Sequence, residues 1–499
     1  MTAFEGTPVH GPAVPAPAGL AAVMRDVVDV VGPDQVAGWP PGCALPGTPN
    51  VGMYRPRHMQ ARIRPHTVEQ VARVIGIVNR HGAPCAVHAV STGHNWGLGS
   101  REPALDDPLT LELDDIDRVR QFDLDAGWAV VEPGVTQGVL ADLLAGTGRM
   151  LNVTASSAHT SVLGNAVDRG VGLRRQRVDD VAGLEVVLPD GATARLGWWP
   201  GEEGEQRAMY PHGLGPSLMP LFFQSNFGVV TAAVIRLLPR PEAQRVTRMS
   251  FARDHLEGAV DALRRWTAQG LVHGVLKIYD EVSTEFYGGR PHEFMAHMCV
   301  SGTLEYVDAV SAVLAGDARR VGLFTGLDDP GSAPEPGDVI VTMAERAFAG
   351  DPSSNDTMLA ATLGRPAGEI DEHGTGWLFF LPMIPFTGRA VARAHALLAE
   401  IHDRTGVRAG CTVNALNSDL IDFVVSFKFD RDRDTERAHR ALDLAYELFA
   451  AEGFLPYRLD IDHASWVDRA GADGPALRLR RELKKTLDPQ GTIAPGRYA

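Results

Sequence analysis

Hydrophobic residues recur at helical spacing in the segment that follows Thr67, and polar residues fill the positions between them. Thr67 and Gln70 form a capping box, which marks the start of a helix, and Gly82 marks its end. One apolar face of this predicted helix consists of Val71, Val74, Ile75 and Val78. The segment therefore predicts an amphipathic helix packed on a core.

Strands and helices then alternate as far as residue 238, where Pro239 and Pro241 interrupt the pattern. Strands are expected at residues 84–90, 109–113 and 128–132, and a helix at 136–144. Residues 91–100, with the sequence STGHNWGLGS, are typical of a glycine-rich loop after a strand.

The order of expected strands and helices changes in the segment 242–450. Strands are expected at 377–381 and 422–429, and amphipathic helices at 387–402 and 435–451, which resembles a split β-α-β layer with helices on one face. The last ~45 residues predict a short strand, a helix near 476–487 and a turn-rich tail. Proline, alanine and glycine dominate the first ~20 residues, which indicates a loose arm.

Length and composition indicate a globular protein of two or three domains. The chain has 499 residues, with 44% hydrophobic and 22% charged residues. A formal net charge of −15 argues against a nucleic acid or an anionic membrane as its main partner. Only four lysines occur, and we attribute the excess of arginine to coding composition: Lys277, Lys428, Lys484 and Lys485.

Cysteine use and the N-terminus predict a cytoplasmic protein. The four cysteines are scattered, which favours free thiols over a disulfide framework or a zinc cluster: Cys43, Cys85, Cys299 and Cys411. Glu5 stands where a signal peptide carries positive charge, and no apolar segment follows it. No apolar run approaches the ~20 residues that a membrane span requires.

Several familiar motifs are absent or defective. His292 and His297 resemble the pair of a zinc-protease helix, but their i, i+5 spacing puts them on different helix faces, and we expect no metal site. The sequence contains no GxxxxGK phosphate loop, no GxGxxG after a strand and no GxSxG elbow. Classical nucleotide-binding and serine-hydrolase sites are therefore not supported.

The glycine loop at 91–100 gains significance from four further motifs in a specific order. They are VEPGVT at 131–136, SVLGNAVDRGVG at 161–172, QSNFGVVT at 224–231 and LDPQGTIAPGR at 487–497. Together they resemble the vanillyl-alcohol oxidase / p-cresol methylhydroxylase family of FAD-linked enzymes. The resemblance covers the chain from about residue 58 to 499.

This resemblance implies an α+β fold: a two-part FAD-binding domain with an inserted antiparallel-sheet cap that forms the substrate pocket. We expect an N-terminal arm and lead-in at 1–57, the FAD-binding domain at 58–242, the cap at 243–450 and a returning segment at 451–499. Relatives of this family are usually dimers or larger assemblies, so a homodimer or higher oligomer is expected.

The expected FAD-binding residues come from these motifs. Backbone N–H groups of the first loop would hold the diphosphate, small residues near position 161 would let the chain approach the flavin, and Arg497 would stabilise the reduced anion. A surface turn and a solvated terminal arginine are the plain alternatives. The full set is Ser91, Thr92, Gly93, His94, Asn95, Gly97, Pro133, Ser161, Gly164, Asn165, Gly228, Val230 and Arg497.

His94 has two interpretations. In the wider superfamily a loop histidine at this point is bonded covalently to the flavin, whereas closer phenol-oxidising relatives attach FAD from the cap or not at all. Asp422 occupies about the place of the cap-side ligand. FAD is therefore either attached through His94 or only hydrogen-bonded by it.

Tyr457 and Arg458 resemble the family's Tyr-Arg pair, which binds a phenolate oxygen; a structural arginine at the domain junction is the alternative. Some relatives place an aspartate near flavin N5, and Ser156 stands there in this chain. His159 could then act as general base, although a loop histidine is more often a plain hydrogen-bonding residue.

We therefore expect an FAD-dependent oxidoreductase that removes a hydride from an alcohol or benzylic carbon of a small phenolic or aromatic substrate to flavin N5. Either O₂ or an electron carrier would reoxidise the flavin. Two alternatives stay open. One is a berberine-bridge-like oxidase of a sugar or natural-product alcohol, and the other is a redox-inactive flavin fold that binds or cyclises its ligand.

Overall fold

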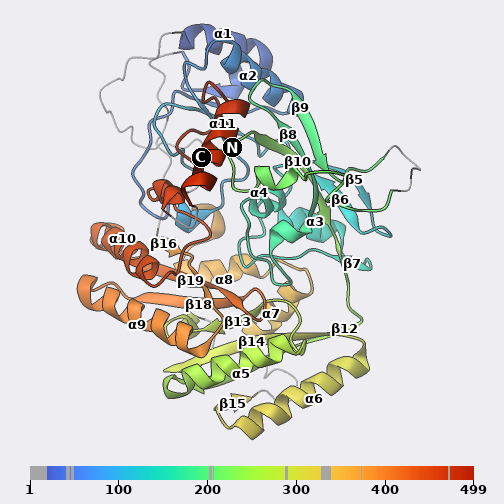
Figure 1. Cartoon of the computed structure of the whole chain (residues 1–499), viewed down its shortest axis with the longest axis vertical. Helices are drawn as coiled ribbons and strands as arrows, with labels where there is room; N and C mark the ends of the chain where they lie inside the picture. Colours follow the sequence, from blue (N-terminus) through green and yellow to red (C-terminus); the bar gives the residue numbers. More distant parts are fainter. Residues whose placement is uncertain are drawn as a thin grey trace.

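The computed structural model of the chain consists of two parts stacked along its longest axis (Figure 1). The described residues before 243 and the end of the chain form the upper part, and those between 243 and 451 form most of the lower part. The structure describes residues 19–40, 45, 50–99, 101–201, 205, 207–286, 290–327, 339–372, 374–469 and 473–498. Within these residues, no helix combines the length and the hydrophobicity needed to cross a membrane.

The first sheet of the upper part has the strand order β1-β2-β4-β3. Its strands are β1 (Val36–Ala37), β2 (Ala61–Ile63), β3 (Val87–Val90) and β4 (Leu109–Glu112), and β2, β4 and β3 run parallel. The predicted helix is present as α2 (Val68–Arg80), and Thr67 Oγ1 caps it by accepting a hydrogen bond from the Gln70 N–H at 3.2 Å. A further helix, α1 (Leu20–Val31), packs on α2 and shares its core, which the sequence pattern did not predict.

The second sheet is antiparallel, with the order β5-β6-β10-β8-β9. Every residue of its strand β8 is buried, so both faces of the sheet are covered at this strand, whereas the edge strands β5 and β9 have exposed residues. Its strands are β5 (Val119–Asp123), β6 (Trp128–Val131), β8 (Val181–Val187), β9 (Thr193–Gly197) and β10 (Val229–Arg236). A two-stranded ribbon and two short helices complete this region: β7 (Arg149–Met150), β11 (Leu238–Pro239), α3 (Gln137–Leu143) and α4 (Val162–Val167).

The lower part is built on one antiparallel sheet of eight strands in the described chain. Its order is β15-β12-β14-β13-β18-β19-β16, and β17 also pairs with β19. The strands are β12 (Ala243–Ala252), β13 (Leu276–Tyr279), β14 (Glu293–Gly302), β15 (Gly326–Leu327), β16 (Gly376–Phe380), β17 (Met383–Pro385), β18 (Ala409–Ala415) and β19 (Leu420–Phe429). The predicted strands at 377–381 and 422–429 correspond to β16 and β19.

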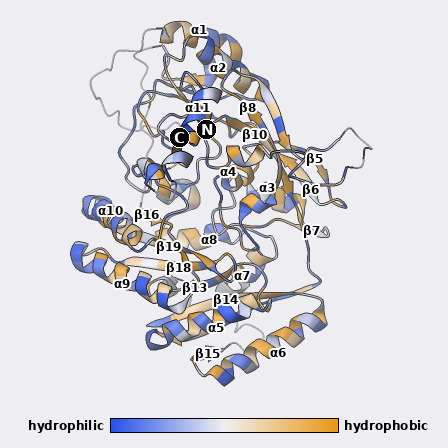
Figure 2. Ribbon diagram, viewed as in Figure 1, coloured by the Kyte–Doolittle hydropathy of each residue, from blue (hydrophilic) through white to orange (hydrophobic). Residues whose placement is uncertain are grey.

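Helices cover one face of this sheet. They are α5 (Leu256–Ala268), α6 (Leu304–Val321), α9 (Gly388–Thr405) and α10 (Thr435–Ala451), and Figure 2 shows hydrophilic and hydrophobic residues mixed along each of them. Cys411, Val413 and Phe423 point into the core beneath these helices, whereas Thr412 and Asn414 line cavities on the other face. Two more helices, α7 (Val339–Phe348) and α8 (Asn355–Leu363), lie between the sheet and the upper part. Because side chains alternate along each strand, one face of the sheet packs under the four covering helices, and the other, called the open face here, is directed toward α7, α8 and the upper part.

The end of the chain returns to the upper part. After α11 (Gly474–Leu487), Val87 of β3 donates a hydrogen bond to the Thr492 carbonyl at 2.7 Å and accepts one from Ala494 at 2.9 Å. The short strand predicted in the last ~45 residues is wrong, because the described residues after α10 form only isolated bridges. The tail is held by these bridges and by Lys484, whose Nζ donates to the Ile493 carbonyl at 2.9 Å.

Candidate functional site

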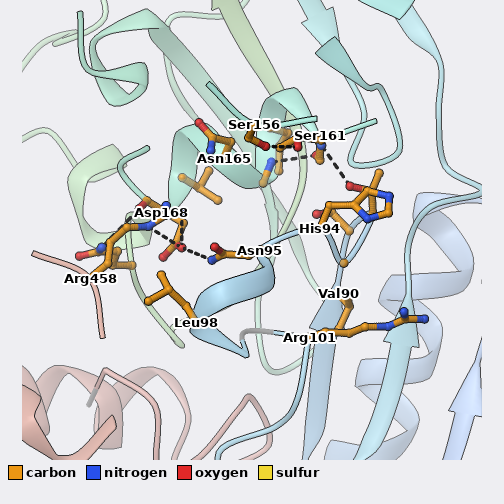
Figure 3. Close-up of a pocket in the computed structure, with 18 of the residues that line it drawn as sticks. Val90, His94, Asn95, Leu98, Arg101, Ser156, Ser161, Asn165, Asp168 and Arg458 are labelled. Atoms are coloured by element: carbon orange, nitrogen blue, oxygen red, sulfur yellow. Dashed lines mark hydrogen bonds and ion pairs between the residues drawn. The ribbon is translucent and has the colours of Figure 1, made fainter. Parts of the chain in front are cut away.

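A cavity of about 390 Å³ lies between the loops of the upper part and the open face of the lower sheet. The loop after β3, the first residues of α4 and the start of β10 form its upper wall. Residues of β16, β18 and β19 line the lower sheet's side, and the segment after α10 and the chain end complete the wall. Segments that are far apart in the sequence therefore meet in one place (Figure 3).

The loop after β3 is tied to two neighbouring segments by side-chain hydrogen bonds. It turns at Gly93, where φ is +73°, a backbone conformation that favours glycine. Thr92 Oγ1 accepts a hydrogen bond from the Ser161 N–H at 3.1 Å, and the Ser161 hydroxyl donates to the Pro133 carbonyl at 2.6 Å. Three of the motif segments that were singled out from the sequence are thus joined directly.

Close approach of α4 to this loop requires glycine at position 164. A Cβ atom built there would lie 2.5 Å from Ser91 Oγ, far inside normal contact. Ser161 also caps α4, because its Oγ accepts a hydrogen bond from the Gly164 N–H at 2.9 Å. Small residues at this turn therefore set the spacing between the loop and α4.

Asp168, at the C-terminal end of α4, is the hub of the polar network in the cavity (Figure 3). Its carboxylate accepts hydrogen bonds from Arg458 Nε at 3.0 Å, the Tyr498 hydroxyl at 2.8 Å and Asn95 Nδ2 at 3.3 Å. A second guanidinium nitrogen of Arg458 also pairs with it. Burial lowers the pKa of Arg458, but Asp168, Tyr457 and Tyr498 together raise it above its usual value, so the guanidinium stays charged.

The open face of the lower sheet adds a second group of polar side chains. Asn414 and Asp422 lie directly opposite each other on β18 and β19, and Asn414 Nδ2 donates to Asp422 at 3.2 Å. Burial raises the pKa of Asp422 to about 7, against the lowering effects of Asn414, Lys277 and Arg458. Burial, followed by the charge of Asp422, raises the pKa of Tyr457, which therefore remains a hydroxyl donor.

Comparison with known proteins shows which proteins the chain is similar to. Residues 59–197 match the family model described as FAD binding domain. The chain is 27% identical to the 4-cresol dehydrogenase [hydroxylating] flavoprotein subunit of Pseudomonas putida, over 88% of this chain and 87% of that protein. It is also 27% identical to 1'-carboxy-chondrochloren decarboxylase of Chondromyces crocatus, over 88% and 90% of the two chains.

Solved structures agree with the sequence relatives. The structure of p-cresol methylhydroxylase with substrate bound matches with a TM-score of 0.82 at 22% identity, covering 96% of both chains. The isoeugenol complex of 4-ethylphenol oxidase from Gulosibacter chungangensis also gives 0.82 at 21% identity, covering 97% of this chain and 99% of that one. In sequence and in fold the chain is therefore similar to the p-cresol methylhydroxylase-type FAD-linked oxidases, and it carries an FAD-binding domain. It is an FAD-dependent oxidoreductase, and the α+β fold with a two-part FAD-binding domain and a cap is confirmed.

Two buried polar atoms on the cavity wall fit the FAD that this family binds. Asn165 Oδ1 and one terminal nitrogen of Arg497 have no hydrogen-bond partner among the described residues. They offer an acceptor and a charged donor, and a buried group of either kind is costly to leave unpaired. Burial lowers the pKa of Arg497, but Tyr498 and Asp168 dominate and raise it, so the side chain presents a positive charge.

Most of the residues singled out from the sequence line this cavity. Besides Asn165 and Arg497 they are Ser91, Thr92, Gly93, His94, Asn95, Pro133, Ser156, Ser161, Gly164, Gly228, Val230, Tyr457 and Arg458. Their individual roles toward FAD remain predictions. Ser100, the last residue of the loop as predicted, lies outside the described residues.

Gly97 and His159 are the two predicted residues that do not line the cavity. Gly97 instead allows the cap to pack on the loop, because a Cβ there would lie 2.2 Å from the Phe379 ring. His159 is exposed, with its ring centroid 6.4 Å from that of His94. Gly228 lines the cavity, but its need for glycine comes from β8: a Cβ would lie 2.8 Å from the Val187 carbonyl oxygen.

His94 and Ser156 sit on the cavity wall with different surroundings. Burial lowers the pKa of His94 to about 4, and His159 and Arg101 act in the same direction, so its imidazole is neutral at pH 7. The Ser156 hydroxyl pairs with Thr160 Oγ1. Its carbonyl accepts a hydrogen bond from Asn355 Nδ2 of α8 at 2.6 Å, which ties this turn to the helix between the two parts.

Sequence reasoning missed several residues of the site. Asp168 stands inside the motif at 161–172 but received no role, although a carboxylate among glycines and small residues was a usable signal. Tyr498 follows Arg497 and was also overlooked. Asn414 and the aromatic wall of Trp377 and Phe379 lie on cap strands, and only the strand register shows that they face the cavity.

Proposed function

We propose that this enzyme oxidises a para-substituted phenol by removing a hydride from the carbon attached at the para position. The observation that supports this most directly is the single cavity that holds Tyr457, Arg458 and Asp422 against the loops of the FAD-binding part. Two relatives with the same architecture are named for 4-cresol and 4-ethylphenol. Bound FAD would accept the hydride at N5.

Tyr457 and Arg458 would hold the phenol oxygen as a phenolate. The raised pKa of Tyr457, caused first by burial, keeps its hydroxyl protonated and able to donate a hydrogen bond. Arg458 supplies a positive charge whose position is fixed by Asp168. Negative charge on the phenol oxygen pushes electrons toward the para carbon, and loss of a hydride there leaves a neutral quinone methide.

We propose Asp422 as the group that takes up the phenol proton. Its pKa, raised by burial to about 7, suits a proton acceptor that works near neutral pH. One of its oxygens has no hydrogen-bond partner among the described residues. Asp422 replaces His159 in this role, because the exposed His159 does not line the cavity, and Ser156 would only orient the turn above it.

The test is anaerobic mixing of the FAD-loaded protein with 4-ethylphenol or its methyl ether, followed by the loss of flavin absorbance. The phenol should bleach the flavin, and the ether should not, because it cannot form a phenolate. Tyr457→Phe should slow bleaching by roughly 100-fold, as expected when a donor to a developing oxyanion is removed. Tyr210→Phe, at an exposed tyrosine, is the matched control and should react at the wild-type rate.

Equal bleaching by phenol and ether would contradict the phenolate step. Bleaching by sugar or natural-product alcohols alone would favour the berberine-bridge-like alternative, and no bleaching by any substrate would favour a redox-inactive module. A parallel assay with O₂ and with an artificial one-electron acceptor would identify the reoxidation route. We also propose that residues 58–242 and 451–499 act as the FAD-binding domain, with 243–450 as the cap.

A further inference from the structure

We propose that the substrate carries a carboxylate, which binds at Lys277 in a second cavity beneath the cap sheet. This inference rests on the proposed function for the position of the reacting end of the substrate. The second cavity has a volume of about 430 Å³ and lies directly beside the first. Both cavities share the following wall residues: Ala155, Leu359, Trp377, Phe379, Asn414 and Val424.

The register of the cap strands brings Lys277 to this cavity. Lys277 of β13 lies directly opposite Asn414 of β18, which lies opposite Asp422 of β19. Residues that are directly opposite in a sheet project from the same face. Lys277 is therefore two strand spacings, or ~10 Å, from Asp422 along the open face of the sheet.

Lys277 is a buried cation that faces the cavity. It is 9% exposed, and no described residue hydrogen-bonds its ammonium group or forms an ion pair with it. Burial lowers its pKa to about 8, while Asp422 opposes this shift, so the group is still mostly protonated at pH 7. Because a buried charge without a counter-ion is costly, the site favours an anion that neutralises it.

The rest of the wall strengthens the positive potential. Arg408 and Lys428 also line the cavity, and no aspartate or glutamate is present among the described residues that line it. This contrasts with the chain as a whole, whose net charge is −15. Half of the four lysines in the sequence therefore stand at one cavity, whose described wall residues include no aspartate or glutamate.

Apolar side chains also line the combined cavity. Leu359 and Phe379 line both cavities, and Met358 lines the second one. A phenol at Tyr457, a short aliphatic spacer along these side chains and a carboxylate at Lys277 would match this order of polar and apolar surfaces. One buried ammonium balances one carboxylate charge, so we assign the anionic group as a carboxylate.

Binding measurements test the subsite without depending on turnover. Calorimetry of the FAD-loaded protein would compare 3-phenylpropanoate, which has no phenol group to oxidise, with 3-phenylpropanamide. The acid should bind more tightly than the amide. Lys277→Met should weaken binding of the acid by roughly 10- to 100-fold and leave binding of the amide unchanged. Lys485→Met, at an exposed lysine of α11, is the control and should change neither.

Two further variants cover the case in which Lys277→Met does not fold. Lys277→Arg should retain the preference for the acid, and Arg408→Gln, at an exposed position on the cavity wall, should weaken acid binding by a few fold. Equal binding of acid and amide to the wild type would overturn the proposal. So would an equal loss of both ligands in Lys277→Met, which would indicate that Lys277 only stabilises the sheet beside Asp422.

The two proposals fail in different ways. If phenols do not bleach the flavin but acid binding depends on Lys277, the proposed function fails and the carboxylate subsite stands. If 4-ethylphenol bleaches the flavin but 3-(4-hydroxyphenyl)propanoate shows no advantage over its amide, the subsite fails and phenol oxidation stands.

Discussion

Replacing Asp168 by asparagine should destabilise the protein, because Asp168 holds a buried guanidinium. The side chains of Asp168 and Arg458 are 19% and 11% exposed, and the carboxylate also accepts hydrogen bonds from Tyr498 and Asn95. Removing one partner of a buried ion pair typically costs about 3–5 kcal/mol, because the other charge stays buried and unpaired. For a chain of this length that unfolds as a unit, this corresponds to a Tm lower by about 3–5 °C.

Differential scanning calorimetry of Asp168→Asn with and without FAD measures this effect. Asp308→Asn provides the control, since Asp308 is 56% exposed in its ion pair with Arg245 and should cost under about 1 kcal/mol. The double variant Asp168→Asn/Arg458→Met should lose less stability than the two single variants together, because both single changes break the same pair. An Asp168→Asn shift no larger than that of Asp308→Asn would refute the hub assignment.

Three other changes should give distinct results. Acid precipitation should leave the flavin with the wild-type protein and release it from His94→Ala; release from the wild type would reduce His94 to a hydrogen-bonding contact. Gly228→Ala should lower the Tm, because the added Cβ would meet the Val187 carbonyl oxygen. Gly316→Ala on helix α6 should raise the Tm slightly, because the space around the added Cβ is open. Equal shifts in Tm for the two variants would contradict this account of the packing at Gly228. Burial, aided by the charge of Arg253, lowers the pKa of His395 to about 3, so the unfolded chain takes up a proton at a higher pH than the folded chain. The free energy of unfolding should therefore fall between about pH 6.5 and pH 3, by up to about 1.4 kcal/mol per pH unit. Denaturant titrations of His395→Gln should show a smaller dependence of this free energy on pH, and an unchanged dependence would contradict the reasoning.

Local sequence signals predicted the elements whose reasons are themselves local. Helix α2 follows from the Thr67 cap and one apolar face, and the loop at Gly93 follows from glycine after a strand. Helix α1 was missed because the sequence around it was interpreted as an arm, whereas its apolar face packs on α2. The short strand predicted before the terminal helix was wrong, because the described residues between α10 and α11 form only an isolated bridge, from Pro456 to Pro382.

The candidate site was only partly predictable because much of it depends on long-range register. The motif residues on the loop and α4 could be identified because glycines and small residues mark close approach of the backbone. The pairing of Lys277 with Asn414 depends on which strands are neighbours, which no local pattern specifies. Asp168 and Arg458 are 290 positions apart, so their ion pair could not be inferred from spacing.

The measurement that tests the central claim most directly is a deuterium isotope effect on anaerobic flavin bleaching. 4-Ethylphenol with deuterium at the benzylic carbon would be mixed with the FAD-loaded enzyme at saturating concentration and compared with the unlabelled compound. If hydride leaves from that carbon, the labelled phenol should bleach the flavin several-fold more slowly. Bleaching at the same rate with both compounds, or no bleaching with either, would contradict hydride removal from the benzylic carbon.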